Sequence, residues 1–360
     1  MTSDVVIAEE ELIVRVVGAM GRLTLNRPRA INALTLGMIR DIDAALTEWE
    51  TDDSVRVVLL DGAGERGFCA GGDIKALWES AKSDPSIAAE YWREEYLLDA
   101  RIASYPKPVV ALMDGLVMGG GVGLAAHARH RVATDRLKLA MPEVGIGFTP
   151  DVGGTWLLSR APGELGTHMA LTGGVIGAQD ALLVDFADAV IPSDAVVAFV
   201  EELRTGDVEG ALTFASASVA PDLGHSKLAA AREWIDAAYA HDTVEEIVAA
   251  LRARPEPDAQ ATAEEIVTKS PTSLKVALRA VREAEELESL EQCLDAEFRA
   301  ACAFLVPDGD FVEGIRAAVI DKDRTPAWKP DTLEAVTQAQ VDRHFAPLQG
   351  IEELGLGAST

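Results

Sequence analysis

The stretch AMPEVGIGFTPDVGG, residues 140–154, determines how the rest of the chain is interpreted. It places two carboxylates, Glu143 and Asp151, eight residues apart among six prolines and glycines. Prolines restrict the backbone and remove N–H donors, whereas glycines allow turns that other residues disfavour, so this composition predicts a loop. Apolar residues alternate with these breakers, which predicts that the loop packs inward and holds its two acids in a cleft.

Two glycine-rich segments precede this loop, FCAGGD at 68–73 and MGGGVG at 118–123. Each follows a short apolar run, at 55–62 or 109–115, of the kind that forms a strand buried on both faces. Each also leads into helical sequence, so the chain contains a repeated strand–loop–helix unit. Two backbone N–H groups that converge from such loops can form an oxyanion hole. The alternative, which these residues alone leave open, is that the glycines serve only tight turns.

The remaining pattern predicts a mixed α/β core at 10–195 followed by a helical portion at 196–345. In the core, further strands are expected at 12–17, 22–25, 131–135 and 137–140, and helices from a cap at Asn32 to about Glu50 and over 86–104. Strand patterns end after Pro192. Helices are then expected near 195–204, 226–253, 261–267 and 273–304.

Composition excludes several classes of protein. The net charge of −27 over 360 residues argues against a nucleic-acid surface, which needs clustered Lys and Arg. No segment offers the roughly 20 apolar residues of a membrane helix, and the acidic N-terminus lacks the features of a signal peptide. Three cysteines without metal-type spacing favour a reducing compartment. We therefore expect a cytoplasmic protein with no metal and no cofactor.

The two acids of the 140–154 loop have two interpretations. An ionised carboxylate beside a polarised carbonyl can act as a nucleophile or general base, and a second one can act as an acid or hold a water molecule. Alternatively, Glu143 is a solvated loop residue and Asp151 caps the helix expected after Gly153. For an isolated pair of loop acids, the second interpretation is the one that the residues favour.

Several motifs, taken together, resemble the crotonase (enoyl-CoA hydratase/isomerase) superfamily in order and spacing. They are NRPRAINAL (26–34), GFCAGGDIK (67–75), KPVVALMDGLVMGGGVGLA (107–125), the 140–154 loop and MALTGG (169–174). Three later segments are similar to its 3-hydroxyisobutyryl-CoA hydrolase branch: SPTSLKVALRA (270–280), EQCLDAEFRA (291–300) and DFVEGIRAAVIDKDRTPAWKP (310–330). This combination is specific enough to favour the functional interpretation of both the loops and the acids.

The resemblance implies a fold and a set of site residues. The fold would be a superhelix of ββα units with a helical C-terminal portion. The family's oxyanion hole would correspond to the backbone N–H groups of Gly72 and Gly120, and its loop acids to Glu143 and Asp151. A further acid near the acyl group would correspond to Glu95. The implied substrate is an acyl-CoA, which is consumed without a separate cofactor, and a homo-oligomer is one assembly that the resemblance leaves open.

Coenzyme A carries phosphates, so an acidic chain needs local cations to bind it. By position in the family pattern, the candidates are Arg27, Arg29 and Lys75; ordinary surface charge is the alternative. We expect the reaction to be hydrolysis of the thioester, in a step of valine breakdown, with Glu143 as nucleophile or base.

One departure from the family's hydratases bears on the reaction. Their second catalytic glutamate lies in a GGGxE pattern, and here that position is Gly123. Hydration needs two carboxylates to hold and split water across a C=C bond, whereas thioester hydrolysis needs only an activated attack at the carbonyl carbon. The alternatives are an enoyl-CoA hydratase or isomerase that uses Asp151 or Glu95 instead, and a catalytically silent acyl-CoA-binding protein.

Overall fold

A six-stranded sheet forms the centre of the α/β core in the computed structural model, which describes residues 10–216 and 225–357. Its order is β1-β2-β3-β5-β7-β9, and only β1 and β2 are antiparallel. The strands are β1 (Leu12–Val17), β2 (Met20–Leu25), β3 (Val57–Gly62), β5 (Val109–Met113), β7 (His130–Thr134) and β9 (Ala189–Ile191). The apolar runs of β3 and β5 are buried, as expected for strands covered on both faces.

A second, three-stranded sheet positions the loops of interest. It contains β4 (Gly67–Cys69), β6 (Leu116–Met118) and β8 (Lys138–Ala140), all parallel and in that order. The two glycine-rich segments and the 140–154 loop follow these three strands directly. Because parallel strands have their carboxyl ends at the same edge of a sheet, three segments far apart in the sequence meet there.

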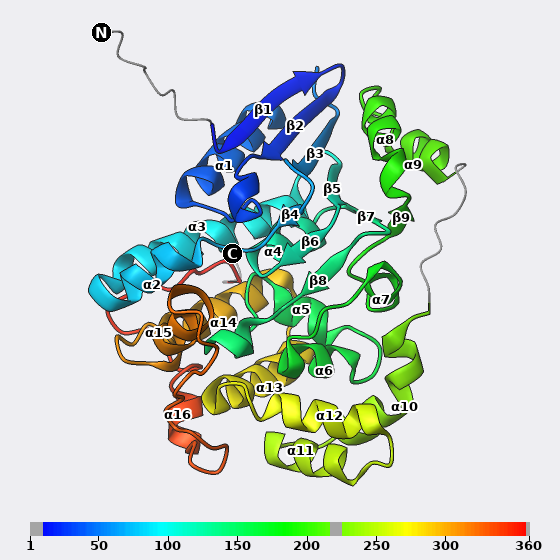
Figure 1. Cartoon of the computed structure of the whole chain (residues 1–360). Helices are drawn as coiled ribbons and strands as arrows, with labels where there is room; N and C mark the ends of the chain where they lie inside the picture. Colours follow the sequence, from blue (N-terminus) through cyan, green and yellow to red (C-terminus); the bar gives the residue numbers. More distant parts are fainter. Residues whose placement is uncertain (1–9, 217–224, 358–360) are drawn as a thin grey trace, which may run out of the picture.

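Helices follow the strands as the repeated units require (Figure 1). They are α1 (Leu36–Glu50), α2 (Ile74–Ser83), α3 (Pro85–Ser104), α4 (Gly120–Ala126), α5 (Gly154–Ser159), α6 (Leu165–Thr172) and α7 (Ala178–Leu183). The expected cap of the first helix is wrong. Thr35 caps α1 by accepting a hydrogen bond from the backbone N–H of Met38, whereas Asn32 is buried with φ 56°. Its side-chain amide instead donates to the carbonyls of Ala63, Gly67 and Phe68, which ties two loops together.

The helical portion contains more, shorter helices than the sequence suggests. They are α8 (Val196–Leu203), α9 (Val208–Ser216), α10 (Lys227–Tyr239), α11 (Val244–Ala253), α12 (Pro257–Ile266), α13 (Pro271–Glu285), α14 (Leu290–Ala303), α15 (Asp310–Ile315) and α16 (Gln338–Asp342). The single helices expected at 226–253 and 273–304 are each two. Thr243 caps α11 and Ser289 caps α14, so each starts a new helix inside the expected one.

The helical portion packs directly on the α/β core. On one face of the large sheet, Phe199 and Leu203 of α8 join a cluster with Val57, Leu59 and Val110, and Figure 1 shows α8 and α9 beside β5, β7 and β9. A larger cluster includes side chains from α1 to α7 and from α10 to α16. The division at residue 195 stays a prediction, and the expectation about a signal peptide concerns residues 1–9, which lie outside the described part of the chain. In that part, no helix is long and apolar enough to cross a membrane.

Candidate active site

A cavity of about 490 Å³ opens where the three loops meet. Its wall combines the two glycine-rich segments with α2, α3, the 140–154 loop and α15. Seven of the eight residues expected to form the site line it: Arg27, Gly72, Lys75, Glu95, Gly120, Glu143 and Asp151. Arg29 does not line it, because its side chain is exposed on the 3₁₀ turn Pro28–Ala30 outside the cavity.

The two glycine-rich loops touch each other beside the cavity. Gly71, with φ 100°, approaches the second loop so closely that a Cβ built on it would lie 3.5 Å from the backbone N of Gly120. Leu34 pairs with Gly72 in an isolated parallel bridge, which fixes the first loop. In residues 10–216 and 225–357, the backbone N–H groups of Gly72 and Gly120 donate to no protein acceptor. Both are therefore available to a ligand in the cavity.

Glu143 lies beside the second glycine-rich loop. It begins the 3₁₀ turn Glu143–Ile146, which follows β8, and it is 5% exposed. Its Oε1 would lie 3.3 Å from a Cβ on Gly119, and its Oε2 is buried without a hydrogen-bond partner in the described residues. Burial, with a contribution from the Asp151 carboxylate, raises the pKa of Glu143 well above its ordinary value. A buried, unpaired carboxylate that lines a cavity is a strong candidate for a chemical role.

Asp151 is held in the same cavity by a tyrosine. The hydroxyl of Tyr96, on α3, donates to its Oδ2 at 2.8 Å. Burial raises the pKa of Asp151 to about 7, although this hydrogen bond opposes the shift. Asp151 does not cap the following helix, because α5 starts at Gly154 with Gly153 in the capping position.

Glu95 lines the cavity from α3. It is buried on α3 and accepts a hydrogen bond from the Tyr91 hydroxyl at 3.3 Å. Its carboxylate lies against Gly120, because a Cβ there would overlap Oε1 of Glu95. Burial, and then the Asp151 carboxylate, raise the pKa of Glu95 well above its ordinary value.

Of the three expected cations, Lys75 is the best placed. It is exposed at the start of α2, lines the cavity, and forms none of the ion pairs in the described residues. The guanidinium of Arg27 is already engaged by Asp73 at 2.9 Å and Glu11 at 3.0 Å. Arg27 therefore stabilises the loop. Because its charge is already paired with two carboxylates, it is less available to bind a phosphate.

Sequence reasoning missed five buried residues with polar groups in or beside this cavity: Tyr91, Tyr96, Asp99, His127 and Glu297. Tyr91 and Asp99 lie one helical turn before and after Glu95 on α3, so the i, i+4 spacing was the available signal. Asp99 is 0% exposed, and neither of its carboxylate oxygens has a hydrogen-bond partner in the described residues. Glu297 comes from α14, almost 150 residues after the 140–154 loop that it contacts. No local sequence pattern indicated this contact.

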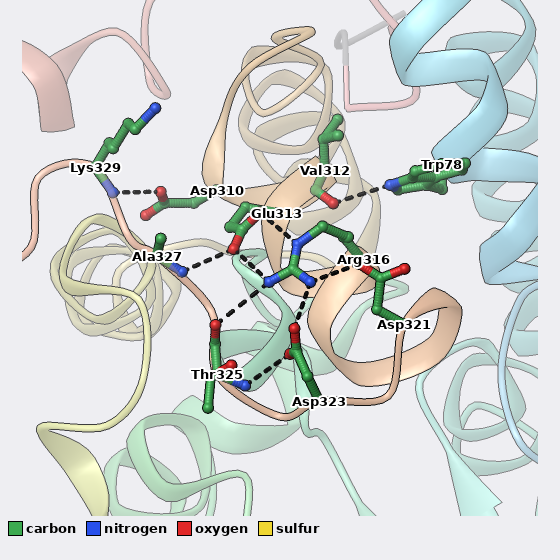
Figure 2. Close-up of polar contacts among 10 residues, drawn as sticks. All are labelled: Trp78, Asp310, Val312, Glu313, Arg316, Asp321, Asp323, Thr325, Ala327 and Lys329. Atoms are coloured by element: carbon green, nitrogen blue, oxygen red, sulfur yellow. Dashed lines mark hydrogen bonds and ion pairs between the residues drawn. The ribbon is translucent and has the colours of Figure 1, made fainter.

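The C-terminal strap, residues 310–330, closes one side of the cavity. Phe311 and Val319 line the wall, and Phe311 packs against Phe148 and Trp92 at ring-centroid distances of 5.0 and 5.8 Å. Arg316 holds the strap together (Figure 2): its guanidinium binds Glu313, Asp321 and Asp323, with nitrogen–oxygen distances of 2.7 to 2.9 Å.

A second set of contacts anchors the strap to the rest of the molecule. The Trp78 indole donates to the carbonyl of Val312 at 2.9 Å (Figure 2). The Ser270 hydroxyl donates to Asp310 at 2.6 Å, and the backbone N–H of Ser270 donates to the carbonyl of Val144. The strap is therefore connected to the turn that carries Glu143.

Comparison with known proteins shows the family of the chain. The model of the enoyl-CoA hydratase/isomerase family matches residues 20–345. The chain belongs to this family. Mitochondrial 3-hydroxyisobutyryl-CoA hydrolase of Danio rerio is 41% identical, over 95% of this chain and 91% of the relative. The enzyme of the same name from Rattus norvegicus is 42% identical, over 92% and 87%.

Two solved structures of the family confirm the fold. A carnitinyl-CoA dehydratase from Mycobacterium thermoresistibile aligns with a TM-score of 0.92 at 50% identity, over 98% of this chain and 100% of that one. An enoyl-CoA hydratase from Rhodobacter sphaeroides aligns with a TM-score of 0.86 at 40% identity, over 94% and 98%. The expected crotonase-like α/β fold with a helical C-terminal portion is correct, whereas the names of these relatives differ on the reaction.

Proposed function

We propose that this chain hydrolyses the thioester of a short acyl-CoA, and specifically that it releases 3-hydroxyisobutyrate and CoA from 3-hydroxyisobutyryl-CoA. The observation that carries the proposal is the position of Glu143. Its carboxylate lines the same cavity as Gly72 and Gly120, and in the described residues neither Oε2 of Glu143 nor the backbone N–H groups of the two glycines have a hydrogen-bond partner. A carboxylate and two free N–H donors in one cavity are what attack on a polarised carbonyl needs. The curated relatives named as this hydrolase support the choice of substrate.

In the proposed reaction, the N–H groups of Gly72 and Gly120 form an oxyanion hole for the thioester oxygen. Glu143 attacks the carbonyl carbon, and the C=O electron pair moves to the oxygen. Collapse of this intermediate breaks the C–S bond, releases the CoA thiolate and leaves a mixed anhydride that water hydrolyses. In the second route, Glu143 removes a proton from water, which attacks the same carbon. Either route uses only side chains, backbone and water, and we propose that no cofactor takes part.

Asp151 and Glu95 are proposed to act on the rest of the substrate. Asp151, fixed by Tyr96, would position the 3-hydroxyl or the attacking water and assist loss of the thiolate. Glu95 would bind near the acyl group from α3. Lys75 is proposed as a contact for the CoA phosphates, and Arg27 and Arg29 as weaker candidates, because Arg27 is paired and Arg29 lies outside the cavity.

Replacing Glu143 with Gln tests this assignment. Gln has nearly the same shape but is neither a nucleophile nor a base, so acyl-CoA binding should persist while thiol release falls by a factor of about 100 or more. A Glu143→Gln enzyme with wild-type kcat would reject the assignment. One turnover in ¹⁸O-labelled water then separates the routes, because label enters the Glu143 carboxylate only through the anhydride.

The second candidate is a hydratase or dehydratase, and the names of the two solved relatives favour it. Gly123 counts against it, because the family's second catalytic glutamate is absent. A panel of acyl-CoAs decides between the candidates: hydrolysis releases free thiol, hydration of crotonyl-CoA removes the enoyl absorbance, and a silent binding protein does neither. Valine breakdown is the pathway that the proposed substrate implies. A cytoplasmic location stays a prediction, since the curated relatives are named as mitochondrial. A homo-oligomer also stays a prediction.

A further inference from the structure

The turn that carries Asp151 is held in a backbone conformation that its own residues disfavour. Val152 has φ 54° and Gly153 has φ 74°, so two successive residues lie in the left-handed region. For a β-branched residue such as valine this region is a genuine outlier and is energetically unfavourable. Contacts from elsewhere in the fold must therefore hold the Val152–Gly153 turn in place.

Two buried side chains hold this turn from opposite directions. His127, which ends α4, places Nε2 at 2.8 Å from the carbonyl oxygen of Val152. Because a carbonyl only accepts, Nε2 carries the hydrogen. Burial lowers the pKa of His127 to about 4, so the neutral ring is the donor at neutral pH. A Cβ on Gly153 would overlap the imidazole, which explains why glycine occupies that position.

Glu297 holds the same turn through its carboxylate. Its Oε2 accepts from the backbone N–H of Gly153 at 2.6 Å. Its Oε1 accepts from the backbone N–H of Thr155 at 2.8 Å and from the Thr155 hydroxyl at 2.6 Å. Both oxygens of this buried carboxylate are thus used to hold the segment directly after Asp151.

Glu297 and its neighbour also support both partners of the hydrogen bond at Asp151. Phe298, the next residue on α14, packs edge-on against Tyr96 with ring centroids 6.2 Å apart. Tyr96 donates to Asp151 at 2.8 Å. Helix α14 therefore contacts Tyr96, the donor of this hydrogen bond, through Phe298. Through Glu297 it also contacts the turn directly after Asp151, the acceptor.

We propose that Glu297, together with His127, is a positioning residue that orients Asp151 in the cavity by fixing the Val152–Gly153 turn. Glu297 does not line the cavity. Its effect on the reaction passes through Asp151, so this inference rests on the role proposed for Asp151. It also gives the EQCLDAEFRA segment, which the catalytic scheme leaves without a role, a specific function.

The experiment is a double-mutant cycle on acyl-CoA hydrolysis with Glu297→Gln and Asp151→Asn. The amide keeps the shape of Glu297 but must point its NH₂ group at one of the N–H donors. We expect Glu297→Gln to lower kcat by about 10- to 100-fold with KM within about twofold, as for a misplaced catalytic group. In an Asp151→Asn background the same change should lower kcat no further, because both act through one step. Cys302→Ala, also buried on α14 but away from the turn, should leave kcat unchanged.

A Glu297→Gln enzyme with wild-type kcat would overturn the proposal, and so would an equal loss of kcat with and without Asp151. Hydrogen exchange provides a readout that does not need turnover. Amides of residues 152–155 should exchange faster in Glu297→Gln than in the wild type, and unchanged exchange there would also contradict the proposed role of Glu297. A wild-type chain that turns over no acyl-CoA would contradict the proposed function alone, since the exchange measurement still tests whether Glu297 fixes the Val152–Gly153 turn.

Discussion

The carboxylate of Asp99 occupies the space that a side chain at position 123 would need. A Cβ on Gly123 would lie 2.8 Å from Oδ2 of Asp99 and 2.7 Å from Cβ of Val152. The position of the hydratases' second glutamate is therefore closed here by α3 and by the turn after Asp151. This packing explains in physical terms why the chain has glycine there.

Introducing the missing acid should not create a hydratase. Gly123→Glu forces side-chain atoms against Asp99 and Val152, and overpacking of this kind costs about 1–3 kcal/mol or more. We expect a lower Tm and no gain in the hydration of crotonyl-CoA, measured by the loss of enoyl absorbance. A folded Gly123→Glu variant with new hydratase activity would show that the site can accept the second acid and would favour the alternative function.

Asp99 should make the fold less stable as the pH rises. Burial, with the Glu95, Asp151 and Glu297 carboxylates, raises the pKa of Asp99 well above its ordinary 3.8. Between those two pKa values the folded chain binds more protons than the unfolded chain, so the free energy of unfolding falls with increasing pH.

Asp99→Asn should therefore raise Tm at neutral pH and flatten the dependence of Tm on pH above about 4, the range in which an unfolded aspartate ionises. Thermal unfolding from pH 4 to pH 8 measures this. Asp53→Asn, an exposed aspartate, is the control and should leave the profile as it is. Equal pH profiles for wild type and Asp99→Asn would contradict the prediction.

Gly120 should be intolerant of any side chain. A Cβ on Gly120 would overlap Oε1 of Glu95, so Gly120→Ala displaces either that acid or the backbone N–H beside it. Loss of one oxyanion donor lowers kcat about 100- to 1000-fold, and we expect a loss on that scale in thiol release. Gly145→Ala is the matched control in the 140–154 loop, because a Cβ there meets nothing within 4 Å. Similar kcat values for the two variants would argue against a close-packed oxyanion loop.

Arg316 should influence substrate binding through the strap. Arg316→Gln leaves Glu313, Asp321 and Asp323 close together without their shared cation, so the strap should loosen and withdraw Phe311 and Val319 from the cavity wall. We expect KM for the acyl-CoA to rise about tenfold, the equivalent of about 1.4 kcal/mol of binding, with a smaller change in kcat.

The control for this prediction is Arg232→Gln, which breaks a half-exposed i, i+4 pair with Asp236 on α10. Such pairs contribute about 0–1 kcal/mol, so steady-state kinetics should match the wild type. An Arg316→Gln enzyme with unchanged KM would mean that the strap keeps its shape without the arginine.

The sequence by itself determined the three loops that meet at the cavity. Glycine and proline restrict the backbone locally, so residues 68–73, 118–123 and 140–154 could be identified as loops without any tertiary information. The apolar runs of β3 and β5 were also recognisable without tertiary information, because burial on both faces of a strand leaves a continuous hydrophobic pattern.

Tertiary structure decided what no local pattern encodes. Asn32 resembles a helix cap in sequence, but the three carbonyls that its amide binds come from a distant loop. Arg27 and Arg29 look alike in the chain, yet one is paired at the cavity and the other lies outside it. Glu297 reaches the Asp151 turn only because α14 packs beside it, since hydrogen bonds between distant segments depend on how the chain folds back and not on its local composition.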